Sequence, residues 1–248
     1  DGLAPDQALL DFLGGGCEKL ALFHCKFHIA NATAAPTQPL AYVAAMRHLK
    51  EQGYRIVHVG REPMPEEFKA LGVLNYAESD IASYRHDLQL FACAKIAVTA
   101  GSGIALLPDC MDIPFVYCDS WHVGMPMASQ RCVIVPSLVE ENLSGRTLTF
   151  QEQIDLYFEL ADKGDEIFPT DKYTARNASA EDVLAAVDEV LALENDATRP
   201  FTQLQMHFRA LDKSGLTEAS RARVSEAFLG RHADLLVNPK QREEEATK

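Results

Sequence analysis

Small residues interrupt one hydrophobic stretch of the chain in a pattern that could hold a phosphate. The β-rich run 96–99 leads into Gly101, Ser102 and Gly103, and an apolar, helix-like stretch starts at Ile104. Glycine lets the backbone approach a ligand without a Cβ in the way, Ser102 offers a hydroxyl at the expected N-cap, and a helix start presents unpaired N–H groups to an anion. The pattern predicts a phosphate or nucleotide site, although a tight strand–helix turn without a ligand would look the same.

Polar residues at the end of the first predicted strand could extend this site. His24, Lys26 and His28 share one face of the segment 19–26 and its continuation if the backbone stays extended. In one interpretation Lys26 neutralises a phosphate. In the other, the three side chains are simply solvated at the end of a strand.

Two other chemistries are less consistent with the spacing. A zinc site of His24, His28, Cys118 and His122 would need imidazoles that an extended H-x3-H separates too far. Ser102 does not fit the nucleophile elbow of hydrolases, because the sequence has alanine two residues earlier where that motif needs glycine.

Trp121 could stack on a base, but large aromatic side chains usually pack in the core.

Strand and helix patterns alternate through the first part of the chain, with short turns between them. Strands are expected at 19–26, 55–59, 73–75, 96–99, 115–118 and, as the last strand, 132–135; helices are expected at 40–52, 66–71, 86–94 and 104–111. This alternation predicts an α/β fold with a doubly wound parallel sheet, a Rossmann-like arrangement. Such sheets bind ligands outside the carboxyl ends of their strands.

The pattern becomes helical after the last expected strand. Helices at 149–163 and 179–193 begin with capping-box signals, Thr149 with Glu152 and Ser179 with Asp182. Further helices are expected at 201–211 and 218–231. The chain therefore divides into an arm (1–16), a parallel α/β nucleotide-binding core (17–148), C-terminal helices packed on the core (149–236) and a charged, disordered tail (237–248).

Composition restricts the class of partner. The 248 residues carry a formal net charge of −13, which argues against nucleic-acid binding because that needs a basic face. No apolar run is long enough to predict a transmembrane segment. An anionic ligand would have to be held by local donors against this background.

The six cysteines contain no C-x-x-C pair and lie mostly in apolar segments. They favour a reducing compartment, the cytoplasm or an organelle interior. Three glycosylation sequons, at Asn31, Asn142 and Asn177, point to a lumenal location instead. The native compartment stays open, since the chain begins at Asp1 and a leader could have been removed.

Several segments, in order, resemble one family of glycosyltransferases. The chain is similar to the C-terminal, nucleotide-sugar-binding half of GT-B-type enzymes from bacterial surface-polysaccharide clusters. The resemblance covers about 20–236 and is carried by residues 42–49, 53–60, 75–79, 87–94, 102–103, 145–152, 177–183 and 227–229.

The resemblance implies a UDP- or GDP-sugar donor, bound as a substrate without a further cofactor or metal. Its diphosphate would lie against Ser102, Gly103 and the helix starting at Ile104, and its base near the loop after Val59. The expected ligand-binding residues are Lys26, Gly60, Gly101, Ser102, Gly103 and Ile104. The acceptor domain of such an enzyme would lie outside this chain, and the catalytic residues stay unassigned.

The sequence departs from this family at three places. Lys26-Phe27 stands where the family has Arg-Asp, and Ala35-Pro36 stands where the family has Arg-Asn. After Gly60 the family has an acidic residue, whereas this chain has Arg61, and Glu62 follows one position later. Three functions therefore remain. The chain could be a nucleotide-sugar-dependent glycosyltransferase domain, a catalytically degenerate structural or accessory subunit of a larger complex, or a nucleotide-binding sensor.

Overall fold

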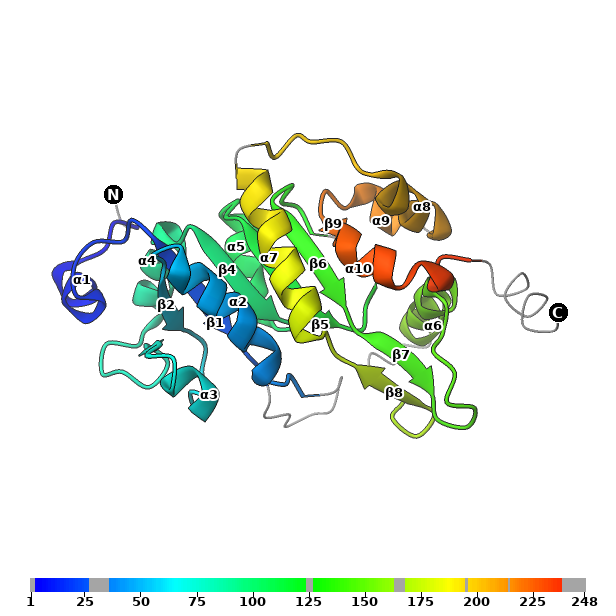
Figure 1. Cartoon of the computed structure of the whole chain (residues 1–248), viewed down its shortest axis with the longest axis horizontal. Helices are drawn as coiled ribbons and strands as arrows, with labels where there is room; N and C mark the ends of the chain where they lie inside the picture. The colour runs from blue at the N-terminus through cyan, green and yellow to red at the C-terminus, as the bar shows by residue number, and fades with distance from the viewer. Residues whose placement is uncertain are drawn as a thin grey trace.

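A computed structural model describes residues 3–26, 36–123, 127–162, 168–194, 196–213 and 215–237. Seven parallel strands form the main sheet, in the order β3-β2-β1-β4-β5-β6-β9 (Figure 1). They are β1 (Leu20–His24), β2 (Arg55–His58), β3 (Leu74–Asn75), β4 (Ile96–Ala100), β5 (Phe115–Ser120), β6 (Cys132–Pro136) and β9 (Arg223–Val224). The α/β fold with a parallel sheet, predicted from the alternating pattern, is confirmed.

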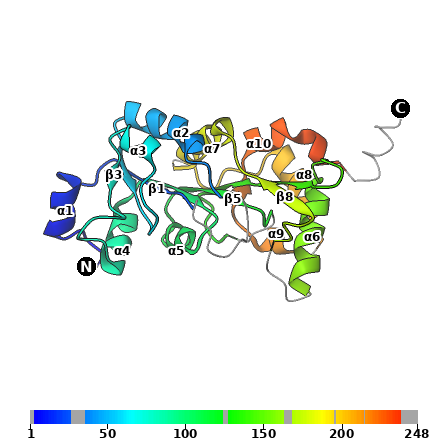
Figure 2. The same cartoon turned by 90° about the horizontal axis from the view of Figure 1, so that it is seen from below.

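Helices cover both faces of this sheet. Figure 2 shows α2, α3, α7 and α10 on one side and α4 and α5 on the other. The helices are α1 (Gln7–Leu13), α2 (Leu40–Glu51), α3 (Glu66–Lys69), α4 (Tyr84–Cys93), α5 (Leu106–Cys110), α6 (Phe150–Asp162), α7 (Ala180–Glu194), α8 (Gln203–Leu211), α9 (Leu216–Ala219) and α10 (Glu226–Arg231), with 3₁₀ turns η1 (Gly103–Ala105) and η2 (Ala233–Leu235).

The strand order reverses between β1 and β4. From β1 the chain winds outward through β2 to β3, and it then returns along α4 to place β4 on the other side of β1. The connections leaving β1 and β4 therefore diverge at the carboxyl edge of the sheet. This divergence opens the crevice in which doubly wound sheets bind ligands.

The core forms because the central strands are apolar on both faces, as parallel strands between helix layers require. The strands β1, β4, β5 and β6 are buried at every position. The long helix α7 packs beside α2 against β4, β5 and β6. Both predicted capping boxes are present, since Thr149 exchanges hydrogen bonds with Glu152, and Ser179 with Asp182.

The C-terminal part differs from the expectation. The predicted helix 218–231 is wrong, because α9 ends at Ala219 and α10 starts only at Glu226. Between them β9 pairs with β6, so residues 132–135 are not the last strand. A second, antiparallel sheet of β7 (Leu138–Glu141) and β8 (Tyr173–Arg176) was also not expected.

The expected division of the chain stays a prediction; its segments are 1–16, 17–148, 149–236 and 237–248. Helix α7 and strand β9, both after residue 148, belong to the main sheet and its cover. Residues 238–248, expected to be a tail, lie outside the described residues.

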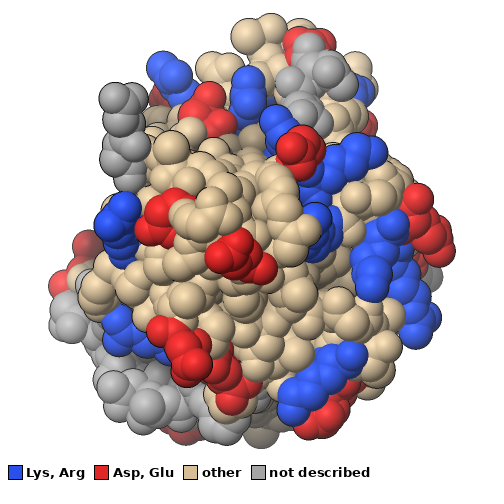
Figure 3. Space-filling view, turned by 90° about the vertical axis from the view of Figure 1, so that its left-hand side faces the viewer, with Lys and Arg blue, Asp and Glu red and all other residues tan. Residues whose placement is uncertain are grey.

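Charge is dispersed on the surface that can be seen in Figure 3. At the end of the molecule that carries α1, acidic and basic side chains interleave around a largely uncharged area. Within the described residues, no helix is both long and apolar enough to cross a membrane.

Candidate functional site

A cavity of about 500 Å³ lies at the carboxyl ends of β1, β2 and β4, beside the point where the strand order reverses. Five of the six predicted site residues line it: Lys26, Gly60, Ser102, Gly103 and Ile104. His24, Arg61, Glu62, Tyr84, Asp87, Leu88 and Leu107 complete the lining. The topology thus brings together residues that are up to 83 positions apart in the chain, from His24 to Leu107.

Gly101, the sixth predicted residue, does not line the cavity. A Cβ added to Gly101 would lie 3.1 Å from the backbone oxygen of Asp119 at the end of β5. The missing side chain therefore lets the turn after β4 pack tightly against the neighbouring strand. Packing alone therefore explains why a glycine stands at this position, and no ligand is needed to explain it.

The turn from β4 into η1 is open toward the cavity. A Cβ added to the exposed Gly103 would meet no atom within 4 Å. Ser102 occupies the N-cap position, but its hydroxyl makes no capping hydrogen bond. The predicted N-cap position of Ser102 is confirmed, and its hydroxyl is left at the cavity wall.

The helix after this turn is shorter than expected. It begins as the 3₁₀ turn η1 and continues as the five-residue α5. The first turn of any such helix leaves its N–H groups without intrahelical acceptors, so Gly103 and Ile104 present amides at this edge. A five-residue helix contributes little macrodipole beyond these local groups.

Gly60, which follows β2, lies against the imidazole of His24 at the end of β1. Gly60 has φ +109, and an added Cβ would lie 2.6 Å from Cδ2 of His24. The imidazole is 5% exposed, and its Nδ1 has no hydrogen-bond partner among the described residues. Burial lowers the pKa of His24 to about 4, and the positive charges of His58 and Lys26 act in the same direction. At neutral pH the ring is therefore uncharged.

The charges lining the cavity are mixed. Lys26 and Arg61 supply two cations, and Glu62 and Asp87 supply two carboxyl groups. Burial raises the pKa of Asp87, although a hydrogen bond with Tyr76 and the charge of Arg61 partly oppose this. Glu62 reaches the cavity despite standing one position later than the resemblance predicts.

An apolar wall completes the cavity. Leu88 from α4, Ile104 from η1 and Leu107 from α5 line it together with the ring of Tyr84. Tyr84 is 74% exposed, and Arg61 donates a hydrogen bond to its hydroxyl and lies 5.3 Å from its ring centroid. A planar aromatic group could pack here while an anionic group meets the polar side.

Sequence reasoning missed the contribution of α4. Tyr84, Asp87 and Leu88 have the i, i+3, i+4 spacing of one helix face, and that spacing was the available signal. Nothing in the local sequence showed which sheet edge this face would meet.

The remaining candidates lie elsewhere or outside the described residues. His28, Phe27 and Ala35 belong to the segment 27–35, which is outside them. No group of three or more potential metal ligands gathers in the part of the chain that the structure describes. Trp121 is 4% exposed and packs on Tyr157 and Phe168, which confirms its predicted place in a core.

Comparisons with protein families, with curated proteins and with solved structures find no match for this chain. The cavity and the fold that positions it are therefore the basis for assigning a function.

Proposed function

We propose that the cavity at the carboxyl ends of β1, β2 and β4 binds a nucleoside diphosphate sugar. In this proposal the chain is the donor-binding domain of a glycosyltransferase-like protein, which transfers the sugar of a UDP- or GDP-sugar when it is active. The observation that carries the proposal is the convergence of Lys26, Gly60, Ser102, Gly103 and Ile104 on one cavity at the topological switch point.

The polar side of the cavity suits a diphosphate. Lys26 supplies an ammonium group, and Ser102 supplies a hydroxyl that makes no capping hydrogen bond. The open turn at Gly103 supplies backbone amides. Such donors would also stabilise the charge that develops on a departing diphosphate.

The apolar side suits the base. Leu88, Leu107 and the exposed ring of Tyr84 offer a surface on which a planar base can stack, a contact worth about 1–3 kcal/mol per base. A volume of about 500 Å³ lies within the range of small-molecule sites.

A second candidate function is a catalytically degenerate subunit of a larger assembly. The observation that favours it is the charge balance of the lining, in which Glu62 and Asp87 offset Lys26 and Arg61. A dianionic diphosphate meets less attraction in such a cavity than in a purely cationic one.

Thermal unfolding with and without ligand tests the proposal. UDP, GDP and their sugars, each in turn at about 100 times its dissociation constant, should stabilise a binding-competent chain by about 2.7 kcal/mol, or about 5 to 10 °C. We expect a shift with at least one of these ligands. No shift with any nucleotide would contradict the proposal and favour the accessory subunit, and a shift without sugar transfer to any acceptor would favour a nucleotide sensor.

Gly103→Glu locates the binding site in the same experiment. Space around Gly103 lets the variant fold, while its carboxylate repels a diphosphate, so the shift should disappear. Gly230→Glu is the matched control, because Gly230 is exposed on α10 and its added Cβ meets only Leu204, at 3.9 Å. A shift that survives Gly103→Glu would show that the phosphates bind elsewhere.

A further inference from the structure

A second cavity, of about 400 Å³, gathers arginines at the opposite edge of the sheet. It lies beside the amino ends of β6 and β9, next to the segment that links α7 to α8. Its lining includes four arginines: Arg199, Arg209, Arg221 and Arg223. Glu218 is the single acidic residue of that lining. The cavity is therefore strongly cationic, although the whole chain has a formal net charge of −13.

Arg223 is a buried cation that forms no ion pair within 4 Å among the described residues. This first residue of β9 is 6% exposed, and its Nη2 donates a hydrogen bond to the carbonyl oxygen of Arg199 at 3.0 Å. Its Nε has no hydrogen-bond partner within the described part of the chain. A buried guanidinium with an unsatisfied N–H group is destabilising, and an anion that accepts a hydrogen bond from this group would remove that penalty.

Phe201 holds two of the guanidinium groups in place. The Arg209 group lies 4.4 Å and the Arg223 group 5.0 Å from the centroid of the Phe201 ring. Arg209 also donates hydrogen bonds to the carbonyl oxygens of Ser220 and Glu218, at 3.1 and 3.3 Å. These contacts fix both groups without neutralising their charge, so the donors are organised before any anion arrives.

Arg199 and Arg221 stand at the exposed side of the same cavity. Among the described residues, no ion pair within 4 Å links any of the four arginines to an acid. Burial lowers the pKa of Arg223, and the charge of Arg199 acts in the same direction, while the charges of Glu189 and Asp196 oppose this. Mutual repulsion of this kind is relieved by a shared anion.

We propose that this arginine cavity binds a phosphate group, either inorganic or carried by a phosphorylated small molecule. Guanidinium groups bind phosphate oxygens in a bidentate manner, and a doubly charged anion can satisfy several of them at once. The site is separate from the cavity proposed for the nucleotide sugar, which lies at the carboxyl edge of the sheet and shares none of these residues.

Calorimetric titration of the full chain with inorganic pyrophosphate at low ionic strength tests this proposal. The double variant Arg199→Gln/Arg221→Gln removes two exposed charges and leaves the buried Arg223 and the half-buried Arg209 in place, so it should fold. We expect pyrophosphate to bind the chain with all four arginines in place, and the double variant to lose at least tenfold in affinity. Binding should also weaken with added salt.

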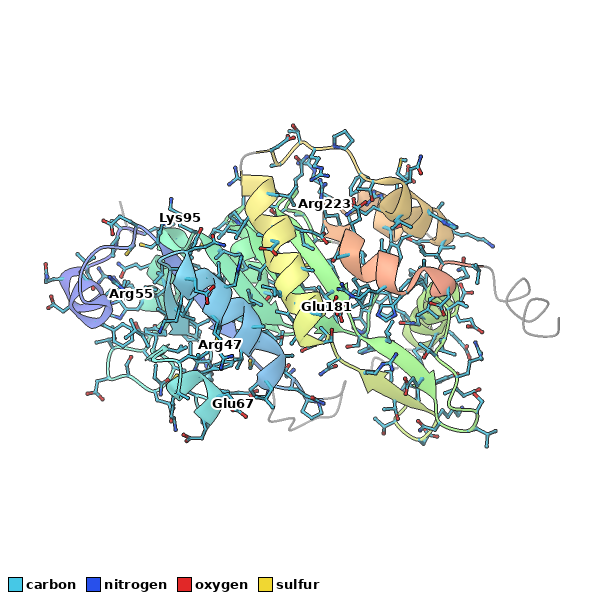
Figure 4. The ribbon with its side chains drawn as sticks, viewed as in Figure 1. Arg47, Arg55, Glu67, Lys95, Glu181 and Arg223 are labelled. Atoms are coloured by element: carbon cyan, nitrogen blue, oxygen red, sulfur yellow. The ribbon has the colours of Figure 1, made fainter. Side chains whose placement is uncertain are left out.

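Two controls make the result specific to this site. Arg47→Gln removes an exposed arginine of α2 far from Arg223, as Figure 4 shows, and should leave the affinity unchanged. All of these titrations are made in a Gly103→Glu background, because this substitution blocks the other cavity, which is itself proposed to bind a diphosphate; any binding measured then belongs to the arginine cavity, which separates this proposal from the nucleotide-sugar proposal. Titrations with phenyl phosphate and with inorganic phosphate then distinguish a site for phosphate esters from a site for the free ion. No pyrophosphate binding, or binding that survives the double substitution, would overturn the proposal.

Discussion

At the scale of single residues, the carboxyl group of Asp119 joins three parts of the molecule. Asp119 has φ +60 at the end of β5, and its side chain accepts hydrogen bonds from the Tyr42 hydroxyl at 3.1 Å and the Ala178 amide at 3.0 Å. Thr37 also forms a hydrogen bond with it. The carboxyl group thereby connects β5 to α2 and to the segment entering α7.

Burial raises the pKa of Asp119 to about 6 despite these hydrogen bonds. Because the folded pKa lies above the unfolded value, the stabilising contribution is complete below about pH 4 and is lost as pH rises through about 6. The shift of about two units corresponds to about 3 kcal/mol. Asp119→Asn keeps the shape and removes the titration.

We therefore expect the stability advantage of Asp119 over the Asn variant to shrink by about 3 kcal/mol between pH 4 and pH 7. Urea unfolding of both proteins across this range measures the difference, in which other titrating groups cancel. A difference that stays constant with pH would show that the carboxyl group ionises normally in the fold.

Individual site residues could be predicted from the sequence only where a local pattern marked them. The Gly-Ser-Gly turn identified Ser102 and Gly103, and the end of a strand identified Lys26. Tyr84 and Asp87 reach the same cavity only because α4 begins at the carboxyl edge of the sheet, and no local pattern encodes that placement. For Gly101 the pattern was right about a close approach, but the approaching group is the β5 backbone and not a ligand.

At the scale of elements, the β9–α10 corner shows how tertiary contacts override a helical pattern. Val224 pairs with Ile134 of β6, and the Ser225 amide donates to the carbonyl oxygen of that same residue. Glu189, from the middle of α7, accepts hydrogen bonds from the Ser225 hydroxyl and from the amides of Glu226 and Ala227, at 2.7 to 3.0 Å. A residue of one helix thus holds the start of another, which the sequence of α10 alone could not show.

Replacing Glu189 should destabilise this corner. Glu189→Ala leaves two backbone amides and a hydroxyl without their charged acceptor, so we expect a loss of about 1.5 to 3 kcal/mol in the free energy of unfolding. Asp188→Ala is the control, because it removes only the exposed contact with His48 and should cost less than about 1 kcal/mol. Equal effects of the two substitutions in urea unfolding would argue against the capping role of Glu189.

At the scale of the whole molecule, alternation of strands and helices was sufficient to predict the fold class. The order of the strands was not predictable in the same way, since β9 reaches β6 across 86 intervening residues. The β7–β8 pair was missed for a related reason, because its pairing depends on packing over Trp121 and Phe168 in a second apolar cluster. The pairing of strands that are distant in the sequence therefore fixes the strand order, which the local pattern does not determine.

The two proposed sites lie at opposite edges of the main sheet. The carboxyl edge offers a mixed-charge cavity with an apolar wall, and the amino edge offers a cationic cavity around Phe201. A nucleoside diphosphate needs an apolar surface beside its phosphate contacts, and among the described residues the first cavity combines the two. The second presents arginines that a phosphate alone can satisfy.

Methyl NMR with UDP tests the central claim most directly, namely that a nucleoside diphosphate binds between β1, β2 and β4. The titration uses the Arg199→Gln/Arg221→Gln variant, so that binding at the second cavity is weakened. The account predicts saturable shifts at the methyl groups of Leu88, Ile104 and Leu107, and none at Leu229, which is buried in α10. Unchanged Leu88, Ile104 and Leu107 signals at millimolar UDP would contradict it.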